Sequence, residues 1–409
     1  MRDSRIDAQG GLSPEDAALH GLTFSPTSGQ DRRFDLTKLE RREIDWQRIA
    51  TLAIEKNASD IQFCLGSPVR LKINGVYLPI SDIDGLDSRE LTSEQVHGAL
   101  FEFVGQNPLQ IQSIESQLAS SGGGDFGFEF EAPGGTRVRF RGNVHSDIGG
   151  LGISLRVLPG AVRPFEQLGL PPQLAQLSDS ARGLILVTGP TGSGKTTTLA
   201  SLTQRRADNH DGHIVTLEQP VEYLIGHSRS LVTQREVGID IPTFAQGLRQ
   251  ALRQDPSVIV VGEMRDPETI EVALTAAETG HLVISTLHTI DTSNTIHRIV
   301  DQYPAEAQNQ IRAQLAGSLL GVCCQQLLPR SNGDGRVVAH EFMVVTDAVR
   351  QHIRSGKEHQ IPSVIQTGRN LGMKLLDEHL GELVRSGDIT MEIAKKAASR
   401  PSEFKGALH

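Results

Sequence analysis

Hydrophobic and polar positions alternate along several segments in the first third of the chain. In residues 137–141 and 151–157 every second side chain is apolar, which predicts strands with one buried face and one exposed face. The exposed face of these strands carries Arg141 and Arg156. A repeat of apolar residues at helical spacing precedes them. The pattern therefore predicts a mixed α+β domain over residues 43–158, with arginines directed away from its core.

Beyond residue 173 the pattern changes to short apolar runs that do not alternate and are separated by helical stretches. These runs are residues 184–187, 214–217, 258–261 and 282–285. Because a continuous apolar run is typical of a strand buried on both faces, the runs indicate a parallel α/β sheet with helices on both sides. We therefore predict an α/β core over residues 174–346. A linker at 159–173 precedes it, and a helical region at 347–400 follows it.

The two ends of the chain are polar and lack apolar periodicity. We interpret residues 1–42 as a disordered tail and residues 401–409 as a second tail. Among 409 residues there are only 3 cysteines, too few for a disulfide framework or a four-cysteine zinc site. The formal net charge of -9 argues against a nucleic-acid-binding protein, so we expect no direct contact with nucleic acid. With no apolar run of about 18 residues and no secretory signal, the sequence predicts a cytoplasmic protein.

A glycine-rich loop follows the first apolar run of the core. It fits the pattern G-x-x-x-x-G-K-[ST] at every position, with Gly189, Pro190, Thr191, Gly192, Ser193, Gly194, Lys195 and Thr196. In such a loop, placed between a strand and a helix, backbone N–H groups turn toward phosphate oxygens. Lys195 is expected to reach the β- and γ-phosphates, and the Thr196 hydroxyl to bind Mg²⁺. The motif therefore predicts a P-loop that binds ATP with Mg²⁺.

Acidic residues follow two of the other apolar runs. Glu263 comes after the run at 258–261. The carboxyl end of a strand next to the P-loop strand is where Mg²⁺ is bound and the attacking water is positioned. Glu263 is our candidate general base or water-orienting group, and the alternative is a helix-capping acid. Glu218 and Glu222 follow the run at 214–217 and are candidates for binding Mg²⁺ or positioning the nucleophile. The alternative for this pair is that they are solvated loop acids.

Two histidines, His281 and His288, bracket the last apolar run. They lie at opposite ends of one short predicted strand and are therefore poorly placed to share a metal ion. We expect instead a sensor of the γ-phosphate or a contact between subunits. The alternative is a purely structural role for each imidazole.

Four segments of the core resemble, in order, the motifs of the secretion-ATPase superfamily of type II and type IV machines. They are the P-loop, the acidic segment 218–222, the segment 252–266 that contains Glu263, and the histidine segment 275–289. The likeness extends over residues 45–405, and it includes the segments 58–61, 140–143, 155–159 and 348–354. Within the superfamily the sequence is most similar to the PilT-like retraction ATPases of type IV pili.

This resemblance implies a homohexameric ring of ATPase subunits. Each subunit would have a PAS-like N-terminal domain linked to a RecA-like P-loop core, with ATP and Mg²⁺ between them. Hydrolysis would rotate one domain against the other around the linker. The motor would work at the inner membrane through a platform protein, with which it associates peripherally, and would disassemble a pilus.

The resemblance also implies roles for individual residues. The catalytic group would comprise Glu263, Glu218, Arg141, Arg156 and His288. Thr197 and His281 would join the P-loop in binding the nucleotide, and Thr196 and Glu222 would face the metal ion. Arg141 and Arg156 match the family's trans-acting arginines, so they would act on a neighbour's nucleotide.

The sequence departs from the family at several points. Gln219 stands where the acidic segment usually has Asp, which leaves a metal-binding role for that position open. The chain also lacks the larger N-terminal region and the four-cysteine zinc element of assembly ATPases, which favours the retraction branch. One alternative function is an ATPase that energises a type IVB, conjugation-type, or type II-like secretion system. A RecA-like DNA-translocating motor is disfavoured by the acidic charge, and a nucleotide-binding regulator by the intact Lys195, Thr196 and Glu263.

Overall fold

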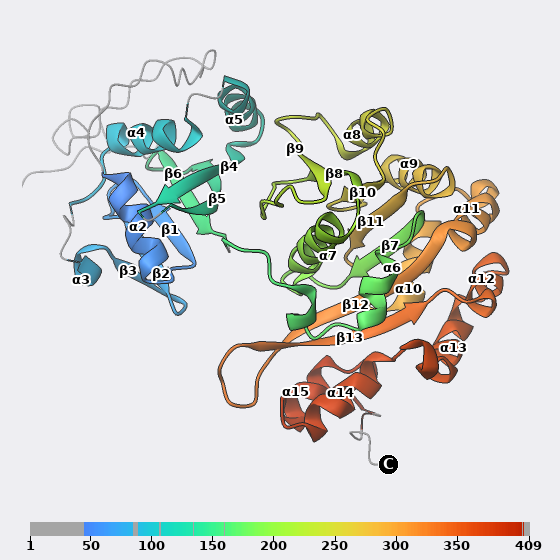
Figure 1. Ribbon diagram of the computed structural model, residues 1–409. Coiled ribbons are helices and arrows are strands. Elements are labelled where there is room, and N and C mark those ends of the chain that lie inside the picture. The colour runs from blue at the N-terminus through green and yellow to red at the C-terminus, as the bar shows by residue number, and fades with distance from the viewer. Residues whose placement is uncertain are drawn as a thin grey trace, which may run out of the picture.

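The computed structural model describes residues 45–84, 89–105, 108–133, 135–158, 160–402 and 404, and Figure 1 shows how their elements are arranged. The tail predicted at 1–42 and most of the tail predicted at 401–409 lie outside the described residues. No helix in this part of the chain combines the length and apolarity needed to cross a membrane.

The first part of the chain forms a six-stranded antiparallel sheet. Its strands are β1 (Asp60–Phe63), β2 (Arg70–Ile73), β3 (Val76–Pro79), β4 (Gly123–Ala132), β5 (Thr136–Ser146) and β6 (Leu151–Val157), in the order β3-β2-β1-β6-β5-β4. The helices are α2 (Trp46–Glu55), α3 (Ser81–Asp84), α4 (Ser93–Val104) and α5 (Pro108–Ser121). Strand residues such as Phe126 and Phe140 share one apolar core with α2, α4 and α5. The alternation read from the sequence thus buries Phe140 and leaves Arg141 on the opposite face.

A second, seven-stranded sheet follows. Its strands are β7 (Gly183–Thr188), β8 (Gly212–Glu218), β9 (Ser230–Glu236), β10 (Val258–Val261), β11 (Leu282–Leu287), β12 (Leu319–Pro329) and β13 (Arg336–Val344), in the order β13-β12-β7-β11-β10-β8-β9. Only β12 and β13 pair antiparallel, and the other neighbours within this sheet are parallel. Leu184 and Leu186 of β7 enter one apolar core, and Ile185 and Val187 enter another. The prediction of a parallel sheet buried on both faces is therefore confirmed.

Helices cover both faces of this sheet and continue beyond it. They are α6 (Pro172–Leu177), α7 (Lys195–Asn209), α8 (Phe244–Ala251), α9 (Pro267–Glu278), α10 (Thr292–Val300), α11 (Ala305–Ser318), α12 (Asp347–Arg354), α13 (Ile361–Thr367), α14 (Leu376–Arg385) and α15 (Met391–Ala397), with short 3-10 turns η2 (Phe165–Gln167), η3 (Glu358–Gln360) and η4 (Arg369–Leu371). In Figure 1 the last two helices lie beside β13, and Leu376 and Leu380 of α14 share a small core with Ala339 of that strand.

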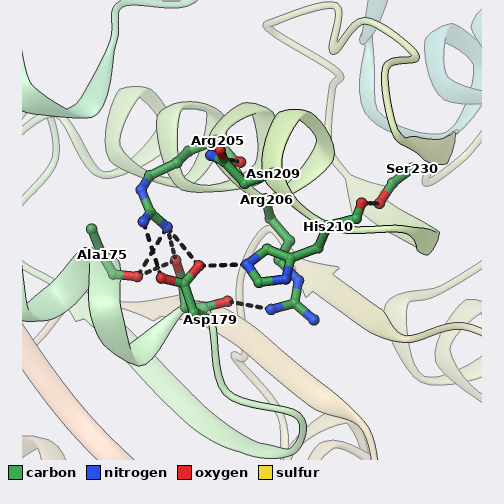
Figure 2. A network of polar contacts seen from close by, with 8 residues as sticks. Ala175, Asp179, Arg205, Arg206, Asn209, His210 and Ser230 are labelled. Carbon is green, nitrogen blue, oxygen red and sulfur yellow. Dashed lines mark hydrogen bonds and ion pairs between the residues drawn. The ribbon is translucent and has the colours of Figure 1, made fainter.

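The helix that begins at the P-loop is fastened at its far end to the loop after α6. Both terminal nitrogens of Arg205 on α7 donate to the carboxylate of Asp179, at 2.7 and 3.0 Å, and Nε2 of His210 lies 2.8 Å from the same group (Figure 2). Arg206 adds a hydrogen bond to the Ser178 carbonyl at 3.2 Å. Because the planar guanidinium of Arg205 matches the carboxylate with two parallel bonds, this contact fixes the direction of α7 as well as its position.

The second half of the predicted linker also packs against α7 and its sheet. The side chain of Phe165 is buried in the same apolar core as Ile185 and Val187. Two residues earlier, the carbonyl of Arg163 accepts a hydrogen bond from Ser201 of α7 at 2.7 Å. Arg163 and Phe165 of the predicted linker therefore pack with the second sheet and its helices.

Candidate nucleotide site

The P-loop lies between β7 and α7 and packs against β12. Gly189 has a φ of 141°, and a Cβ added there would lie 2.2 Å from the carbonyl oxygen of Gln325 on β12. The side chain of Gln325 donates to the Ser193 carbonyl at 2.7 Å and accepts from the Thr198 hydroxyl at 3.0 Å. Glycine is required at position 189 both by its backbone conformation and by this close approach. The neighbouring strand thus holds the loop in its path toward the first turn of α7.

Lys195, the first residue of α7, points back into the P-loop. Its Nζ donates to the carbonyl oxygens of Gly189 at 2.8 Å and Pro190 at 3.0 Å. Burial lowers the pKa of Lys195, and the negative charge of Glu263 acts in the opposite direction. The ammonium group is therefore held at the mouth of the loop, where phosphate oxygens would meet it.

A cavity of about 700 Å³ opens above the P-loop, and both sheets contribute to its walls. The residues predicted for the site that line it are Thr191, Gly192, Gly194, Lys195, Thr196, Thr197, Glu218, Gln219, Glu222, Glu263, His288, Arg141 and Arg156. Gly189, Pro190 and Ser193 do not line the cavity, and they shape the loop from behind through the contacts described above. The volume lies within the range of small-molecule sites.

Glu263 stands just beyond the carboxyl end of β10 and is held there by two donors. Nε2 of His288 lies 2.9 Å from its Oε1, and Nε of Arg265 lies 2.6 Å from the same oxygen. The helix-capping alternative does not apply, because Asp266 is the residue whose side chain caps α9, accepting from the N–H of Thr269 at 2.8 Å. Glu263 is thus directed into the cavity, where a water molecule beside the nucleotide would be within its reach.

The two other acids have different surroundings. Glu218, at the end of β8, accepts hydrogen bonds from Thr216 at 2.6 Å and Gln234 at 3.0 Å. Burial raises the pKa of Glu218 although both hydrogen bonds favour the charged form. It is therefore not a solvated loop acid. Glu222 is more open, and its carboxylate lies 3.9 Å from Nη1 of Arg141.

Arg141 and Arg156 are direct partners in the pairing of β5 with β6. Nε of Arg156 donates to Asp60 on the next strand at 3.0 Å, and Arg141 faces Glu222. Both side chains line the cavity that contains the P-loop of their own chain. The fold thus brings both arginines to the cavity of their own chain, and their action on a neighbour's nucleotide stays a prediction.

His281 is separated from the site by the length of a strand. It precedes β11, whereas His288 follows it, and parallel strands carry their functional residues at the carboxyl end. Over six residues a strand extends about 20 Å. The His281 ring instead lies 3.2 Å from the Ala276 carbonyl in the preceding helix, and it does not line the cavity. Its predicted contact with the nucleotide is thus not formed within this chain.

The cavity residues that were not predicted from the sequence include two arginines and a tyrosine. Arg265 binds Glu263, Tyr223 contacts the Thr197 hydroxyl at 2.9 Å, and Arg336 reaches the cavity from the start of β13. Arg265 could have been found from its position two residues after Glu263. Arg336 carried no local signal, because its place depends on the pairing of β13 with β12.

The residues of the cavity fit a Mg²⁺ ion shared with a nucleotide. The Thr196 hydroxyl and the carboxylates of Glu218, Glu222 and Glu263 are hard oxygen donors around one space. Among the described residues, no group of three or more His, Cys, Asp or Glu side chains is arranged to hold a metal ion. In Mg²⁺ sites of nucleotide-binding proteins, phosphates and water supply most ligands and the protein one or two.

Comparison with known proteins identifies a family whose sequence model matches this chain, and several similar proteins. The sequence model of the family described as "Type II/IV secretion system protein" matches residues 127–398. The "Type IV pilus retractation ATPase PilT" of Pseudomonas aeruginosa is 41% identical over 361 residues, which are 88% of this chain and 100% of that protein. A crystal structure of the pilus retraction motor PilT with bound ADP superposes with a TM-score of 0.79 at 41% identity, covering 88% of this chain and 99% of that one. The ATPase DotB of Legionella pneumophila superposes with a TM-score of 0.69 at 28% identity, covering 88% and 97%.

Proposed function

Because the chain belongs to the type II/IV secretion system protein family, we propose that it is an ATP-hydrolysing motor that drives the retraction of a type IV pilus. One observation carries this proposal. In a chain that aligns with the full length of a pilus retraction ATPase, the P-loop lysine, a carboxylate at a strand end and two arginines line the same cavity.

The proposed reaction converts ATP and water to ADP and phosphate. Lys195 and the P-loop backbone bind the phosphates, and Thr196 with Glu222 or Glu218 would hold Mg²⁺, which neutralises phosphate charge when bound. Glu263 orients the attacking water and takes its proton. Arg141 and Arg156 stabilise the charge that develops on the transferred phosphoryl group, in the cavity of their own chain.

The proposal includes an assembly. Six copies would form a ring at the cytoplasmic face of the inner membrane, where a platform protein of the pilus machine receives the work. The first sheet with its helices would be the PAS-like domain, and the second sheet would be the RecA-like core. Domain rotation during hydrolysis would take place around the linker segment that precedes Phe165, since Phe165 itself is buried against the core.

Steady-state ATPase assays on the purified protein test the chemistry. Lys195→Ala should abolish hydrolysis. Arg137→Gln should leave the rate of hydrolysis unchanged, because Arg137 is exposed and pairs with Glu129 at 3.4 Å within the first sheet. Full hydrolysis by Lys195→Ala would refute the proposal that this P-loop is the ATPase site.

A second candidate is an ATPase that energises another secretion machine. It is supported by the description of the family, which includes secretion systems, and by the likeness to DotB. Chromosomal Glu263→Gln in the native host separates the two candidates. More surface pili, which no longer retract, would establish a retraction motor, and fewer pili would indicate assembly. Unchanged pili with lost protein or plasmid transfer would establish the secretion role.

A further inference from the structure

Three arginines occupy alternate positions on one face of β5, and their surroundings differ. Arg137 is exposed and pairs with Glu129 of the neighbouring strand. Arg141 lines the nucleotide cavity. Arg139, between them, has a side chain only 16% exposed, and it reaches past Gly127 of its own sheet to pair with Glu236 of the second sheet. This middle arginine has no part in the proposed chemistry, although it is the most buried of the three.

The guanidinium of Arg139 closes a ring of polar contacts across the two sheets. Its Nε donates to the carbonyl of Val221 at 2.5 Å, and its Nη2 donates to Oε2 of Glu236 at 2.8 Å. The same carboxylate oxygen accepts from the N–H of Val221 at 3.1 Å. The carbonyl and the N–H of Val221 are therefore both hydrogen-bonded to this ion pair. Glu236 is itself buried, so removal of Arg139 would leave a buried carboxylate without its cationic partner.

Val221 lies in the acidic segment that forms one wall of the nucleotide cavity. Its neighbour Glu222 and the nearby Gln219 both line that cavity. On the side of the core, Gln234 donates to the Tyr223 carbonyl at 2.9 Å and to Glu218 at 3.0 Å. The acidic segment is thus held from one side by its own sheet and from the other by an arginine of the first sheet.

We infer that Arg139 is a positioning residue that holds the acidic segment in its catalytic geometry only while the two sheets are in contact. It acts through Val221 and Glu236 and does not touch the nucleotide site. This inference deepens the proposed function, and it rests on that function for its kinetic consequence. Separation of the sheets would release Val221, and Glu222 would then lose its defined place opposite Arg141. Hydrolysis would thereby be coupled to domain closure.

Two measurements on the full-length protein test the inference. In steady-state ATPase assays, Arg139→Gln should lower kcat by about tenfold or more with little change in KM for ATP, because the P-loop is untouched. Arg139→Lys should give an intermediate kcat, since an ammonium can pair with Glu236 but lacks the fork that also reaches the carbonyl. The matched control Arg137→Gln, on the same face of the same strand, should behave as wild type. An unchanged kcat for Arg139→Gln, or a loss that appears wholly in KM, would overturn the inference.

Amide hydrogen exchange provides a readout that does not need hydrolysis. Exchange in peptides covering residues 219–223 should be at least about tenfold faster in Arg139→Gln than in Arg137→Gln, while the P-loop peptides stay unchanged. Glu236→Gln should give the same local increase, and the double variant no further increase, since both changes open one ring. Unaltered exchange in 219–223 would overturn the inference. Absence of hydrolysis by the wild type with altered exchange would instead overturn only the proposed function.

Discussion

Nε2 of His288 lies 2.9 Å from Oε1 of Glu263, and this contact joins the carboxyl ends of two adjacent strands. Arg265 binds the same oxygen at 2.6 Å. Two nitrogens from different segments therefore meet at one oxygen of this carboxylate. The geometry makes His288 a residue that orients the proposed general base.

Substitution at these two positions should have effects of different size. Glu263→Gln should lower kcat by about two orders of magnitude or more, because general bases contribute at that level. His288→Ala should lower kcat by about tenfold, because it removes one of two donors that orient Glu263. The double variant should be no slower than Glu263→Gln alone. Multiplied losses in the double variant, measured by steady-state kinetics, would show that His288 acts independently of Glu263.

The placement of the arginines in their own chain's cavity predicts the behaviour of mixed assemblies. Lys195→Ala and Arg141→Gln subunits, co-expressed with different tags and purified through both, should show no ATPase activity beyond that of the separate variants. Each site in the mixture lacks one of the two groups if both must come from one chain. Activity that reappears on mixing would demonstrate that a neighbouring subunit supplies the arginine.

A buried pair of histidines predicts acid sensitivity of the C-terminal helices. The rings of His340 and His379 lie 3.9 Å apart. Burial, together with the positive charge of Lys374, lowers the pKa of His379 to about 4, although Glu382 opposes the shift. Because the unfolded chain binds a proton near pH 6.5 and the folded chain does not, the free energy of unfolding should fall as the pH drops from about 6.5 toward 4.

Denaturant titrations at several pH values check this expectation. His379→Gln keeps an acceptor for the His340 N–H, which bonds to His379 at 3.0 Å in the wild type. This variant should lose a part of the acid sensitivity, on the order of 2 kcal/mol across the window. His297→Gln, on an exposed ion pair of α10, serves as the control and should retain the wild-type pH profile. Equal profiles for the wild type and His379→Gln would contradict the expectation.

Asp179 holds the far end of α7 through Arg205 and His210 and does not line the cavity. We therefore predict that its substitution destabilises the fold and leaves the cavity residues unchanged. Asp179→Asn removes the charge that binds Arg205 and His210, and it should lower the free energy of unfolding by about 1 kcal/mol, since the pair is partly exposed. Although burial favours its neutral form, the hydrogen bonds from Arg205 and His210 together lower the pKa of Asp179. Its contribution is therefore present at neutral pH and lost only in acid, below the ordinary carboxyl range.

Thermal unfolding of Asp179→Asn beside Asp211→Asn provides the comparison. Asp211 binds Arg229 at 2.7 Å with both side chains largely exposed, so its loss should shift the midpoint much less. Equal shifts of the midpoint for the two variants would mean that the contact of Asp179 with α7 stabilises the fold no more than an exposed ion pair does.

The sequence predicted the parts of the site that depend on local order along the chain. The P-loop, the strand that precedes it and the acid after β10 could be read directly, because each lies within a few residues of an apolar run. Strands β9 and β12 were harder to find, since polar residues such as Gln234 and Gln325 interrupt their patterns. Those same glutamines bind the acidic segment and the P-loop.

Contacts between distant segments account for the rest. His281 and His288 looked equivalent in the sequence, and only the direction of β11 separates them. Arg139 looked like any exposed arginine of an alternating strand, because its partner Glu236 lies 97 positions away, on the edge strand of the other sheet. No local pattern contains this pairing, which arises from the docking of one sheet on the other.

Lys195 already donates to the carbonyls of Gly189 and Pro190, so an arriving phosphate competes with the backbone of the loop for the ammonium and not with bulk water. The lysine exchanges oxygen acceptors over a short distance, and its buried charge is hydrogen-bonded before and after the exchange. Each phosphate contact then yields a smaller net gain in affinity than it would with a solvated lysine. Release of a phosphate group would therefore leave the ammonium of Lys195 hydrogen-bonded to the loop carbonyls and not without acceptors.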